Sequence, residues 1–342
     1  MADGIRHLTL DEAIALHASF AAPRPGTLHP LYVEADARRD AALQPAYLTY
    51  SHQGQHWMHA LHLTRVPGTD WLDASSPYGY GGPLSSSDDP GFIGQAWAAY
   101  TQWMREQRVV VEYVRFHPVL ANERHYGGTV ETNREVVCID LQANDAVEMG
   151  YASRLRTTLK KAARAPLAYR EEPLGPLAAA FGRCYRAAMQ EIGADPFYLF
   201  DDAYFEQLAS TGLVTLGICT LQHGSADDWL AACLLLDGAG MREYHLAATN
   251  AQGRPWGASS FALDQAARAA QRRGARAFYL GGGTDRRPDN ALLFFKSAFS
   301  GQRLMYRTGA TVFNDTAYEE LKQRFPAAWQ AHPERPIFYR KV

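Results

Sequence analysis

The sequence predicts a mixed α/β protein made of two similar domains. Runs with the alternation typical of β-strands stand between longer runs whose apolar residues have helical spacing. The order of strands, long loop, helix and strand also occurs twice. The first strand runs begin at Tyr47 and Leu213, which are 166 residues apart (213 − 47), and the helices at Gly91 and Gly257 have the same separation.

This repeat is one of architecture, because the two copies share few identical residues. It places the first domain at residues 1–147 and the second at residues 148–342. A final strand at residues 337–341 could pair back with the first domain.

Local signals define the elements of the first domain. Thr9 and Glu12 form the pattern of a capping box at the start of a helix. Residues 53–55 are a turn between two strand-like runs, which predicts a hairpin. The expected elements are a helix at 10–18, strands at 31–34, 47–52 and 57–66, a long loop at 73–87, a helix at 91–107, a strand at 108–116, a loop at 118–128 and a strand at 130–141.

The second domain begins with a helix for which Ser153 is the expected N-cap. Three strand-like runs follow two further helices, and an Ala-rich helix precedes a buried type of strand. The expected elements are helices at 153–165, 174–192 and 201–210, strands at 213–222, 229–237 and 241–249, a helix at 257–274, a strand at 275–280, a helix at 290–300, a strand at 304–313, a helix at 315–325 and the strand at 337–341.

Composition excludes several classes of protein. Hydrophobic residues make up 47% of the chain and charged residues 20%, so the chain can bury a core and is not globally disordered. The net charge of −2 argues against a dedicated duplex-DNA binder. The four cysteines contain no C-x-x-C pair, so we expect neither a zinc cluster nor a disulfide scaffold, but reduced thiols in a cytoplasmic protein.

The chain shows no secretory signal pattern at its N-terminus and no apolar run near the ~20 residues that span a bilayer. At most a peripheral membrane contact is expected. Four histidines at 52, 56, 59 and 62 fall on different faces of the expected hairpin. They therefore predict no metal site.

The most unusual segment is the loop at 75–83, which contains Tyr78 and Tyr80 between glycines. Glycine allows a ligand to approach the backbone closely, and tyrosine offers both a ring and a hydroxyl. The loop is a candidate binding element, and the alternative is a surface loop whose tyrosines only pack its base. It is not a dinucleotide fingerprint, since G-x-G-x-x-G is absent.

Two further segments could meet a phosphate. The helix at 153–165 carries five cations, Arg156 and Lys160 among them, and no acid, which suits a phosphate-bearing partner or a solvated face. The turn with Arg254, Gly257 and Ser259 stands between a strand and a helix. It could aim backbone N–H groups at a phosphate, or be an ordinary turn.

Lys296 is the only charge in an apolar helix that follows the glycines at 281–283. A buried lysine is costly unless it meets an anion or loses its proton. The alternative is a lysine that extends along the surface to reach water.

Four segments occur in an order that resembles the Fem-type branch of the GNAT superfamily, which includes the aminoacyltransferases of peptidoglycan cross-bridges. They are SPYGYGGP at 76–83, VRFHPVL at 114–120, RLRTTLKKA at 154–162 and YHLAATN…LGGG…LFFKSAFSG at 244–301. The resemblance covers roughly residues 45–340. It implies tandem GNAT-like domains, each a mixed sheet flanked by helices, with a substrate channel between them.

The resemblance also implies transfer of an acyl or aminoacyl group to an amine of a cell-wall precursor, an amino sugar or a related metabolite. The donor would be acyl-CoA or aminoacyl-tRNA, and no metal is implied. Lys296 matches the family's lysine at the reaction centre, where its ammonium would stabilise the oxyanion or the departing hydroxyl. The implied substrate-binding residues are Tyr78, Tyr80, Arg115, His117, Arg156, Lys160, Tyr244, Gly281, Gly282 and Gly283.

Other readings of the same residues remain open. Arg254, Gly257 and Ser259 partly match the Q/R-x-x-G-x-G/A turn that cradles coenzyme A in GNAT enzymes, so a plain acetyl-CoA-dependent N-acetyltransferase is the first alternative. A non-catalytic GNAT-like binding module is the second. The long helical arm with which cross-bridge enzymes handle tRNA has no counterpart in residues 174–210, which weakens the case for tRNA as the donor.

Overall fold

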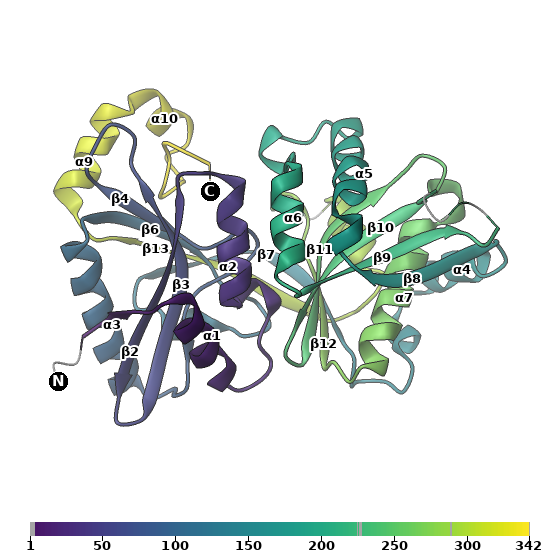
Figure 1. The fold of residues 1–342 in the computed structure, drawn as a ribbon, viewed down its shortest axis with the longest axis horizontal. Helices are drawn as coiled ribbons and strands as arrows, with labels where there is room; N and C mark the ends of the chain where they lie inside the picture. Colours follow the sequence, from purple (N-terminus) through teal and green to yellow (C-terminus); the bar gives the residue numbers. More distant parts are fainter. Residues whose placement is uncertain (1–3, 224, 226–227, 288, 342) are drawn as a thin grey trace. The chain divides into compact units, whose positions relative to one another are not determined.

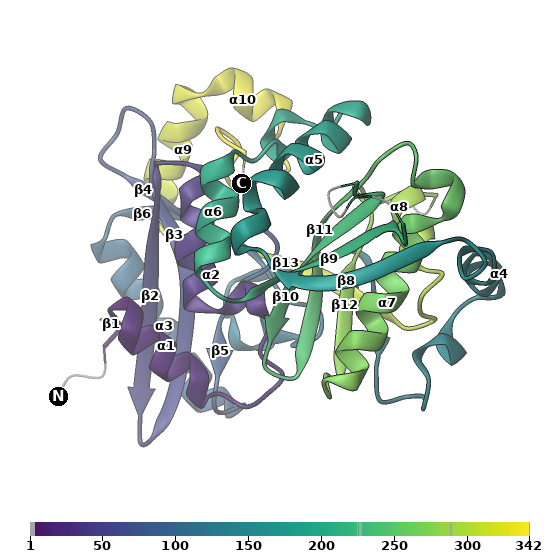
Figure 2. The same cartoon turned by 45° about the vertical axis from the view of Figure 1, so that its right-hand side comes forward.

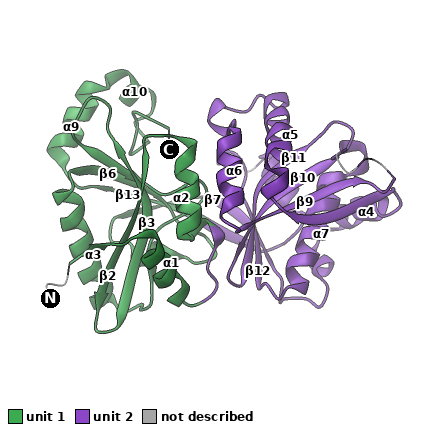
Figure 3. Ribbon diagram, in the orientation of Figure 1, with its two compact units in different colours: residues 1–21, 27–133, 306–342 green, residues 22–26, 134–305 purple. Residues whose placement is uncertain are grey.

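The computed structural model describes residues 4–223, 225, 228–287 and 289–341. They form two compact units of mixed α/β structure, so the expected fold class is confirmed (Figure 1). Unit 1 comprises Met1–Ala21, Thr27–Asn133 and Tyr306–Val342, and unit 2 comprises Ala22–Gly26 and Arg134–Met305 (Figure 3).

The sheet of unit 1 has the order β1-β2-β3-β4-β6-β13, and β5 pairs with β3. The strands β1 to β4 are antiparallel neighbours, β4 and β6 are parallel, and β6 and β13 are antiparallel. The bounds are β1 Arg6–His7, β2 Leu43–His52, β3 Gln55–Arg65, β4 Leu72–Ser75, β5 Leu84–Ser85, β6 Val109–Arg115 and β13 Arg303–Val312.

The sheet of unit 2 repeats this pattern in the order β8-β9-β10-β11-β12-β7. The strands β8 to β11 are antiparallel neighbours, β11 and β12 are parallel, and β12 and β7 are antiparallel. The expected repeat of architecture is therefore present. The bounds are β7 Thr129–Asp140, β8 Leu167–Pro173, β9 Val214–Leu221, β10 Ala231–Gly238, β11 Met241–Thr249 and β12 Ala277–Gly281.

Each parallel pair is connected by a long helix that packs on its own sheet. In unit 1, α3 (Pro90–Glu106) connects β4 to β6 and buries Phe92, Ala96, Tyr100 and Met104 at helical spacing. In unit 2, α7 (Ala258–Arg272) connects β11 to β12 and packs an alanine-rich face on β9 and β10 (Figure 2).

The remaining helices complete the two units. The α-helices are α1 Leu10–Ser19, α2 Pro30–Asp36, α9 Asp315–Arg324 and α10 Pro326–Ala331 in unit 1, and α4 Ser153–Ala162, α5 Ala178–Glu191, α6 Asp202–Ser210 and α8 Ala291–Lys296 in unit 2. Short 3-10 helices occur at Gly26–Leu28, Ala37–Arg39, Asn122–His125, Val147–Gly150, Gly175–Leu177, Pro196–Tyr198 and Arg254–Trp256. No helix among the described residues is long and apolar enough to cross a membrane.

The residue ranges of the two compact units differ from the expected boundary between residues 147 and 148. The difference arises from two strands. After β6 the chain enters unit 2 through β7, and after β12 it returns to unit 1 through β13, which pairs with β6. The local pattern of a strand predicts that it is extended but not which sheet it joins.

Several expected elements differ in the structure. Residues 31–34 belong to α2, because the His29 side chain caps Leu31 N–H and Pro30 occupies the first helical turn. The N-cap of α4 is Ala152, with no capping side chain, so the prediction of Ser153 as the cap is wrong.

One loop and the C-terminal segment also differ. The loop expected at 73–87 contains β4 and β5. Residues 337–341 form bends and turns instead of a strand, and they belong to unit 1. There Arg340 and Tyr339 both bind the buried Asp73 carboxylate, so side-chain contacts and not strand pairing hold this segment.

Candidate functional site

Lys296 lies at the end of α8 and is buried, with 8% of its surface exposed. Its ammonium nitrogen donates a hydrogen bond of 2.9 Å to the carbonyl oxygen of Gly282. The same nitrogen lies 5.8 Å from the centroid of the Tyr244 ring. The structure therefore brings together the predicted catalytic lysine and two of the predicted substrate-binding residues.

The environment of Lys296 disfavours its charged form. Burial and, to a lesser degree, the nearby Arg134 guanidinium lower the pKa of Lys296 to about 7. Within the described part of the chain, no carboxylate forms an ion pair with this ammonium. Amine and ammonium forms are thus both available near neutral pH, which suits acid–base chemistry.

The three glycines before α8 adopt a backbone that side chains would disrupt. Gly281 has φ +76° and lies at a register shift between β12 and β7. A Cβ on Gly283 would lie 2.4 Å from Oδ1 of Asn290. This close approach lets the loop fold back over the start of α8 and places the Gly282 carbonyl above Lys296.

Asn290 organises this loop, although we did not select it as a site residue from the sequence. Its Oδ1 accepts the N–H groups of Leu292 and Leu293 at the start of α8. Its amide nitrogen donates to Thr284 Oγ1 at 2.8 Å and to Asp285 Oδ1 at 3.1 Å. An asparagine directly before an apolar run is a typical N-cap pattern, and that signal could have identified it.

Tyr244 follows the point at which the two parallel strands stop pairing. The pairing of β11 with β12 runs from Met241 to Glu243 along β11, whereas β11 continues to Thr249. The opposite neighbour β10 has a register shift at the same level, between Leu234 and Leu235. From Tyr244 onward, β11 therefore continues without pairing to β12 among the described residues.

The basic helix α4 lies against α8. Arg154 donates to the carbonyl oxygen of Phe294 at 2.6 Å, and its guanidinium carbon stands 3.8 Å from the centroid of the Phe294 ring. Arg156 donates to the carbonyl oxygen of Tyr151, and Lys160 is exposed. The two predicted residues of α4 therefore lie on the surface of the helix that packs against α8, and among the described residues neither contacts Lys296 itself.

The turn at Arg254–Trp256 lies beside the other end of α4. Gly257 has φ +67°, and a Cβ atom added to it would lie 3.1 Å from the methyl group of Thr158. The Arg254 guanidinium forms an exposed ion pair of 2.7 Å with Glu191 of α5. Ser259 Oγ lies 2.6 Å from Thr249 Oγ1. In this conformation the side chains of Arg254 and Ser259 bind other residues of unit 2.

In unit 1, Arg115 holds the loop that contains Tyr78 and Tyr80. Its guanidinium donates to the carbonyl oxygens of Ser76 at 2.9 Å and Pro77 at 3.0 Å. The N–H of Tyr78 donates to the buried carboxylate of Asp36 at 2.8 Å. We expected Arg115 to orient substrate groups, and the structure shows that it anchors this loop.

Tyr80 forms a small aromatic group with two neighbours. Its ring centroid lies 5.1 Å from that of His117 and 5.6 Å from that of Tyr306, both in edge-to-face geometry. The Val119 N–H donates to Nδ1 of His117 at 3.3 Å, so Nδ1 acts as an acceptor there. The predicted residues Tyr80 and His117 are thus in contact.

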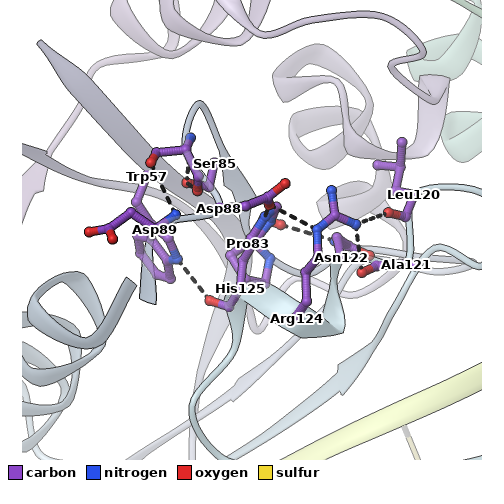
Figure 4. A network of polar contacts seen from close by, with 11 residues as sticks. Trp57, Pro83, Ser85, Asp88, Asp89, Leu120, Ala121, Asn122, Arg124 and His125 are labelled. Atoms are coloured by element: carbon purple, nitrogen blue, oxygen red, sulfur yellow. Dashed lines mark hydrogen bonds and ion pairs between the residues drawn. The ribbon is translucent and has the colours of Figure 1, made fainter. Parts of the chain in front are cut away.

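Asn122 clamps the far end of the loop, and we missed it in the sequence. Its amide nitrogen donates to the carbonyl oxygens of Gly81 at 3.0 Å and Pro83 at 3.1 Å, and its Oδ1 accepts the N–H of His117 at 2.9 Å. Figure 4 shows this buried amide beside the contacts of Asp88 with Arg124 and His125. No sequence pattern around Asn122 distinguishes it from an ordinary loop asparagine.

The predicted residues therefore form two groups, one within each unit. Tyr78, Tyr80, Arg115 and His117 lie together in unit 1. In unit 2, Lys296 contacts Gly282 and Tyr244. The side chains of Arg156, Arg254 and Ser259 bind other residues of unit 2. Among the described residues, no group of three or more His, Cys, Asp and Glu side chains could hold a metal ion.

No protein-family model matches the sequence, and a comparison with curated proteins finds no match either. Solved structures do match over almost the whole chain. FemX has a TM-score of 0.71 at 12% identity, covering 93% of this chain and 100% of its own. The C-terminal domain of a putative lysylphosphatidylglycerol synthetase from Agrobacterium fabrum has a TM-score of 0.59 at 13% identity, covering 94% and 97%.

L-PGS from Bacillus licheniformis has a TM-score of 0.54 at 12% identity, covering 90% of this chain and 94% of its own. At such low identity these matches establish the fold. The chain has the fold of FemX, of the lysylphosphatidylglycerol synthetase domain and of L-PGS, as expected from its resemblance to the Fem-type branch of the GNAT superfamily.

Proposed function

We propose that this protein is a Fem-like acyltransferase that moves an acyl or aminoacyl group onto an amine. The acceptor would be a cell-wall precursor, an amino sugar or a related metabolite. The proposal rests above all on the buried Lys296, whose ammonium donates one hydrogen bond among the described residues, to the Gly282 carbonyl oxygen at 2.9 Å. A buried cation of this kind is costly to keep and is typical of functional sites.

The chemistry of Lys296 fits this reaction. Attack of an amine on an acyl carbon creates negative charge on the acyl oxygen and then on the leaving group. A fixed ammonium in a site with little water stabilises both charges, and removing one such donor typically costs about 10²–10³ in rate. The fold shared with a domain of a putative lysylphosphatidylglycerol synthetase supports the proposed class of reaction.

The loop of unit 1 would position the acceptor. Tyr78 and Tyr80 are half-buried, and Asp36, Arg115 and Asn122 hold the backbone around them. A loop that is fixed before the substrate arrives loses little conformational entropy on binding. This favours recognition of one acceptor geometry by ring contacts and hydroxyl groups.

The donor would be aminoacyl-tRNA or acyl-CoA. The exposed cations of α4 favour a donor rich in phosphates, and Arg154 stacked on the exposed Phe294 adds an aromatic face next to them. Coenzyme A has its own supporting feature, the left-handed Gly257 at the start of α7. Against it, Arg254 is already paired with Glu191.

A calorimetric titration against acetyl-coenzyme A and against a charged tRNA mixture separates the donors. We expect saturable binding of tRNA that weakens steeply with salt, as the release of counterions requires. Arg156→Gln and Lys160→Gln should weaken it, whereas Arg183→Gln on α5 serves as a matched surface control.

Binding of acetyl-coenzyme A alone, reduced by Arg254→Gln, would instead make the protein a plain acetyl-CoA-dependent N-acetyltransferase. Binding of an acceptor without turnover of either donor would contradict the proposed activity and favour a binding module.

A further inference from the structure

A cleft with a volume of 190 Å³ lies in unit 2, between α5 and the ends of β10 and β11. The helix α5 packs over β11 at this place (Figure 1). Neither Lys296 nor Tyr244 is among the described residues that line the cleft. The cleft is therefore separate from the group around Lys296.

One face of α5 forms the first wall of the cleft. Its lining residues are Cys184, Ala187, Ala188 and Glu191. Residues three, four and seven positions after Cys184 lie on the same side of an α-helix. The sequence of α5 thus turns two alanines and one carboxylate toward the cleft.

The space exists because the residues of both walls are small. Ala232 of β10 and Ala248 of β11 are paired across the two strands and line the wall opposite the alanines of α5. Protein interiors are normally filled by interlocking side chains, whereas methyl groups on both walls leave this space open. An apolar cavity of about 150 Å³ takes up benzene, so the cleft has room for one aromatic ring or a branched alkyl group.

Glu191 is the charged residue that a ligand in this cleft would meet. Among the described lining residues, it is the one with a formal charge. Its Oε1 receives the Arg254 guanidinium at 2.7 Å, and 45% of the Glu191 side chain is exposed. A carboxylate offers about four acceptor positions, so Glu191 can accept a second cation beside the first. An ammonium group complements this rim, and a carboxylate group would be repelled.

Two other polar residues of the cleft make hydrogen bonds within unit 2. The Asn250 amide donates to the carbonyl oxygen of Trp229 at 2.7 Å and accepts the N–H of Gly253 at 2.7 Å. Thr249 Oγ1 lies 2.6 Å from Ser259 Oγ. These groups shape the rim, and the charge of Glu191 determines which ligand is preferred.

We propose that this cleft binds a small primary amine, whose apolar body lies between the alanines and whose ammonium pairs with Glu191. The ion pair with Arg254 is no obstacle, because ion pairs between exposed side chains are weak. The inference assigns a second ligand site to unit 2, and it does not depend on the proposed acyl transfer.

Three probes of similar shape test the assignment by calorimetry. Phenethylamine is a cation near neutral pH, phenethyl alcohol is neutral and phenylpropionate is an anion. We expect saturable binding of phenethylamine, about two- to fivefold tighter than that of phenethyl alcohol, as a partly exposed ion pair allows. Absence of saturable phenethylamine binding, or tighter binding of phenylpropionate, would contradict the proposal.

Variants of the ion pair should change binding in opposite directions. Glu191→Gln removes the negative charge and should abolish the preference for phenethylamine over phenethyl alcohol. Arg254→Gln removes the competing cation and should tighten the binding of phenethylamine. Glu206→Gln, at an exposed position of α6, is the matched control and should leave the affinities unchanged. A preference that persists in Glu191→Gln would refute the role of this carboxylate.

A larger side chain in the cleft tests where the probes bind. Ala187→Leu lies on the exposed side of α5 and should weaken the binding of phenethylamine and phenethyl alcohol alike. Ala179→Leu, exposed on the same helix but outside the lining, should not. Equal binding by both variants and the unaltered protein would overturn the inference.

The thiol of Cys184 gives a second measure of location. Cys184 is exposed, whereas Cys138, Cys219 and Cys233 are buried, so iodoacetamide should label Cys184 first. Saturating phenethylamine should slow this labelling, as followed by mass spectrometry of the intact protein. An unchanged labelling rate would show that the amine binds elsewhere and would overturn the inference.

Discussion

Lys296 and Gly282 are joined by a hydrogen bond of 2.9 Å from the ammonium nitrogen to the carbonyl oxygen. This bond connects the last residue of α8 to the glycine loop that precedes the helix, so the catalytic candidate and its loop form one unit. Because the ammonium is buried and receives no carboxylate from the described residues, its charge weakens the fold. Variants of Lys296 and of the side chains that hold the neighbouring loops test these contacts.

Lys296→Met should make the protein more stable at neutral and acidic pH. The folded-state pKa of about 7 lies below the ordinary lysine pKa of 10.5, so the unfolded chain binds more protons between these values. Stability of the unaltered protein therefore rises as pH increases from about 7 to 10, by up to several kcal/mol. Thermal unfolding should show a gain for Lys296→Met that is large at pH 6 and shrinks toward pH 10. A gain independent of pH would contradict a buried, protonated lysine.

Asn290→Ala should disrupt both α8 and the glycine loop. Loss of an N-cap costs roughly 1 kcal/mol, and here the two bonds to Thr284 and Asp285 are lost as well. Hydrogen exchange should increase at residues 281–296. Asn290→Asp retains the acceptor for the helix N–H groups and should keep α8 protected. If Asn290→Ala leaves exchange unchanged, Asn290 does not hold the loop.

Asn122→Leu should release the loop that carries Tyr78 and Tyr80. The change leaves the carbonyl oxygens of Gly81 and Pro83 without their donor, at a cost of roughly 1–3 kcal/mol for each buried group. Limited proteolysis and hydrogen exchange at residues 76–83 measure the effect. Asn122→Asp still accepts the N–H of His117 but cannot donate to the carbonyl oxygens of Gly81 and Pro83. This variant therefore tests the accepted and the donated hydrogen bonds separately. Equal protection in all three proteins would refute the clamp.

Arg340→Ala should destabilise unit 1 strongly. It leaves the fully buried Asp73 carboxylate without its charged partner, and removing one member of a buried pair typically costs about 3–5 kcal/mol. Chemical denaturation measures the loss. Arg335→Ala is the matched control, since 42% of the Arg335 side chain is exposed and its ion pair among the described residues is with the exposed Glu334 at 3.6 Å. A similar small loss in both variants would show that the C-terminal segment is not held by Asp73.

The sequence predicted those features that depend on neighbouring residues. The capping box of Thr9 and Glu12 is present, and so are the β2–β3 hairpin and the periodic helix α3. It could not predict that β7 pairs with β12 and β13 with β6, because the choice of a partner strand depends on the whole fold. Asp36 and Asn122 were missed for the same reason, since each acts on a loop about 40 residues away in the chain.

The candidate site shows the same limit. The isolated charge in an apolar helix identified Lys296, because one local anomaly marked it. Arg115 was selected as a substrate-binding residue, and its guanidinium donates to the carbonyl oxygens of Ser76 and Pro77. A polar side chain at a strand end has the same sequence pattern whether it anchors a loop or meets a substrate, and only its contacts distinguish these roles.

Acyl transfer by the unaltered protein and by Lys296→Met is the most direct test of the proposed role of Lys296. Each is incubated with radiolabelled acetyl-coenzyme A or charged tRNA and a panel of amine acceptors, with Lys341→Met as the exposed control. We expect labelled amide product with the unaltered protein and the control, and a loss of about 10²–10³ in rate with Lys296→Met although this variant is at least as stable. Full turnover by Lys296→Met would contradict the central role of this lysine.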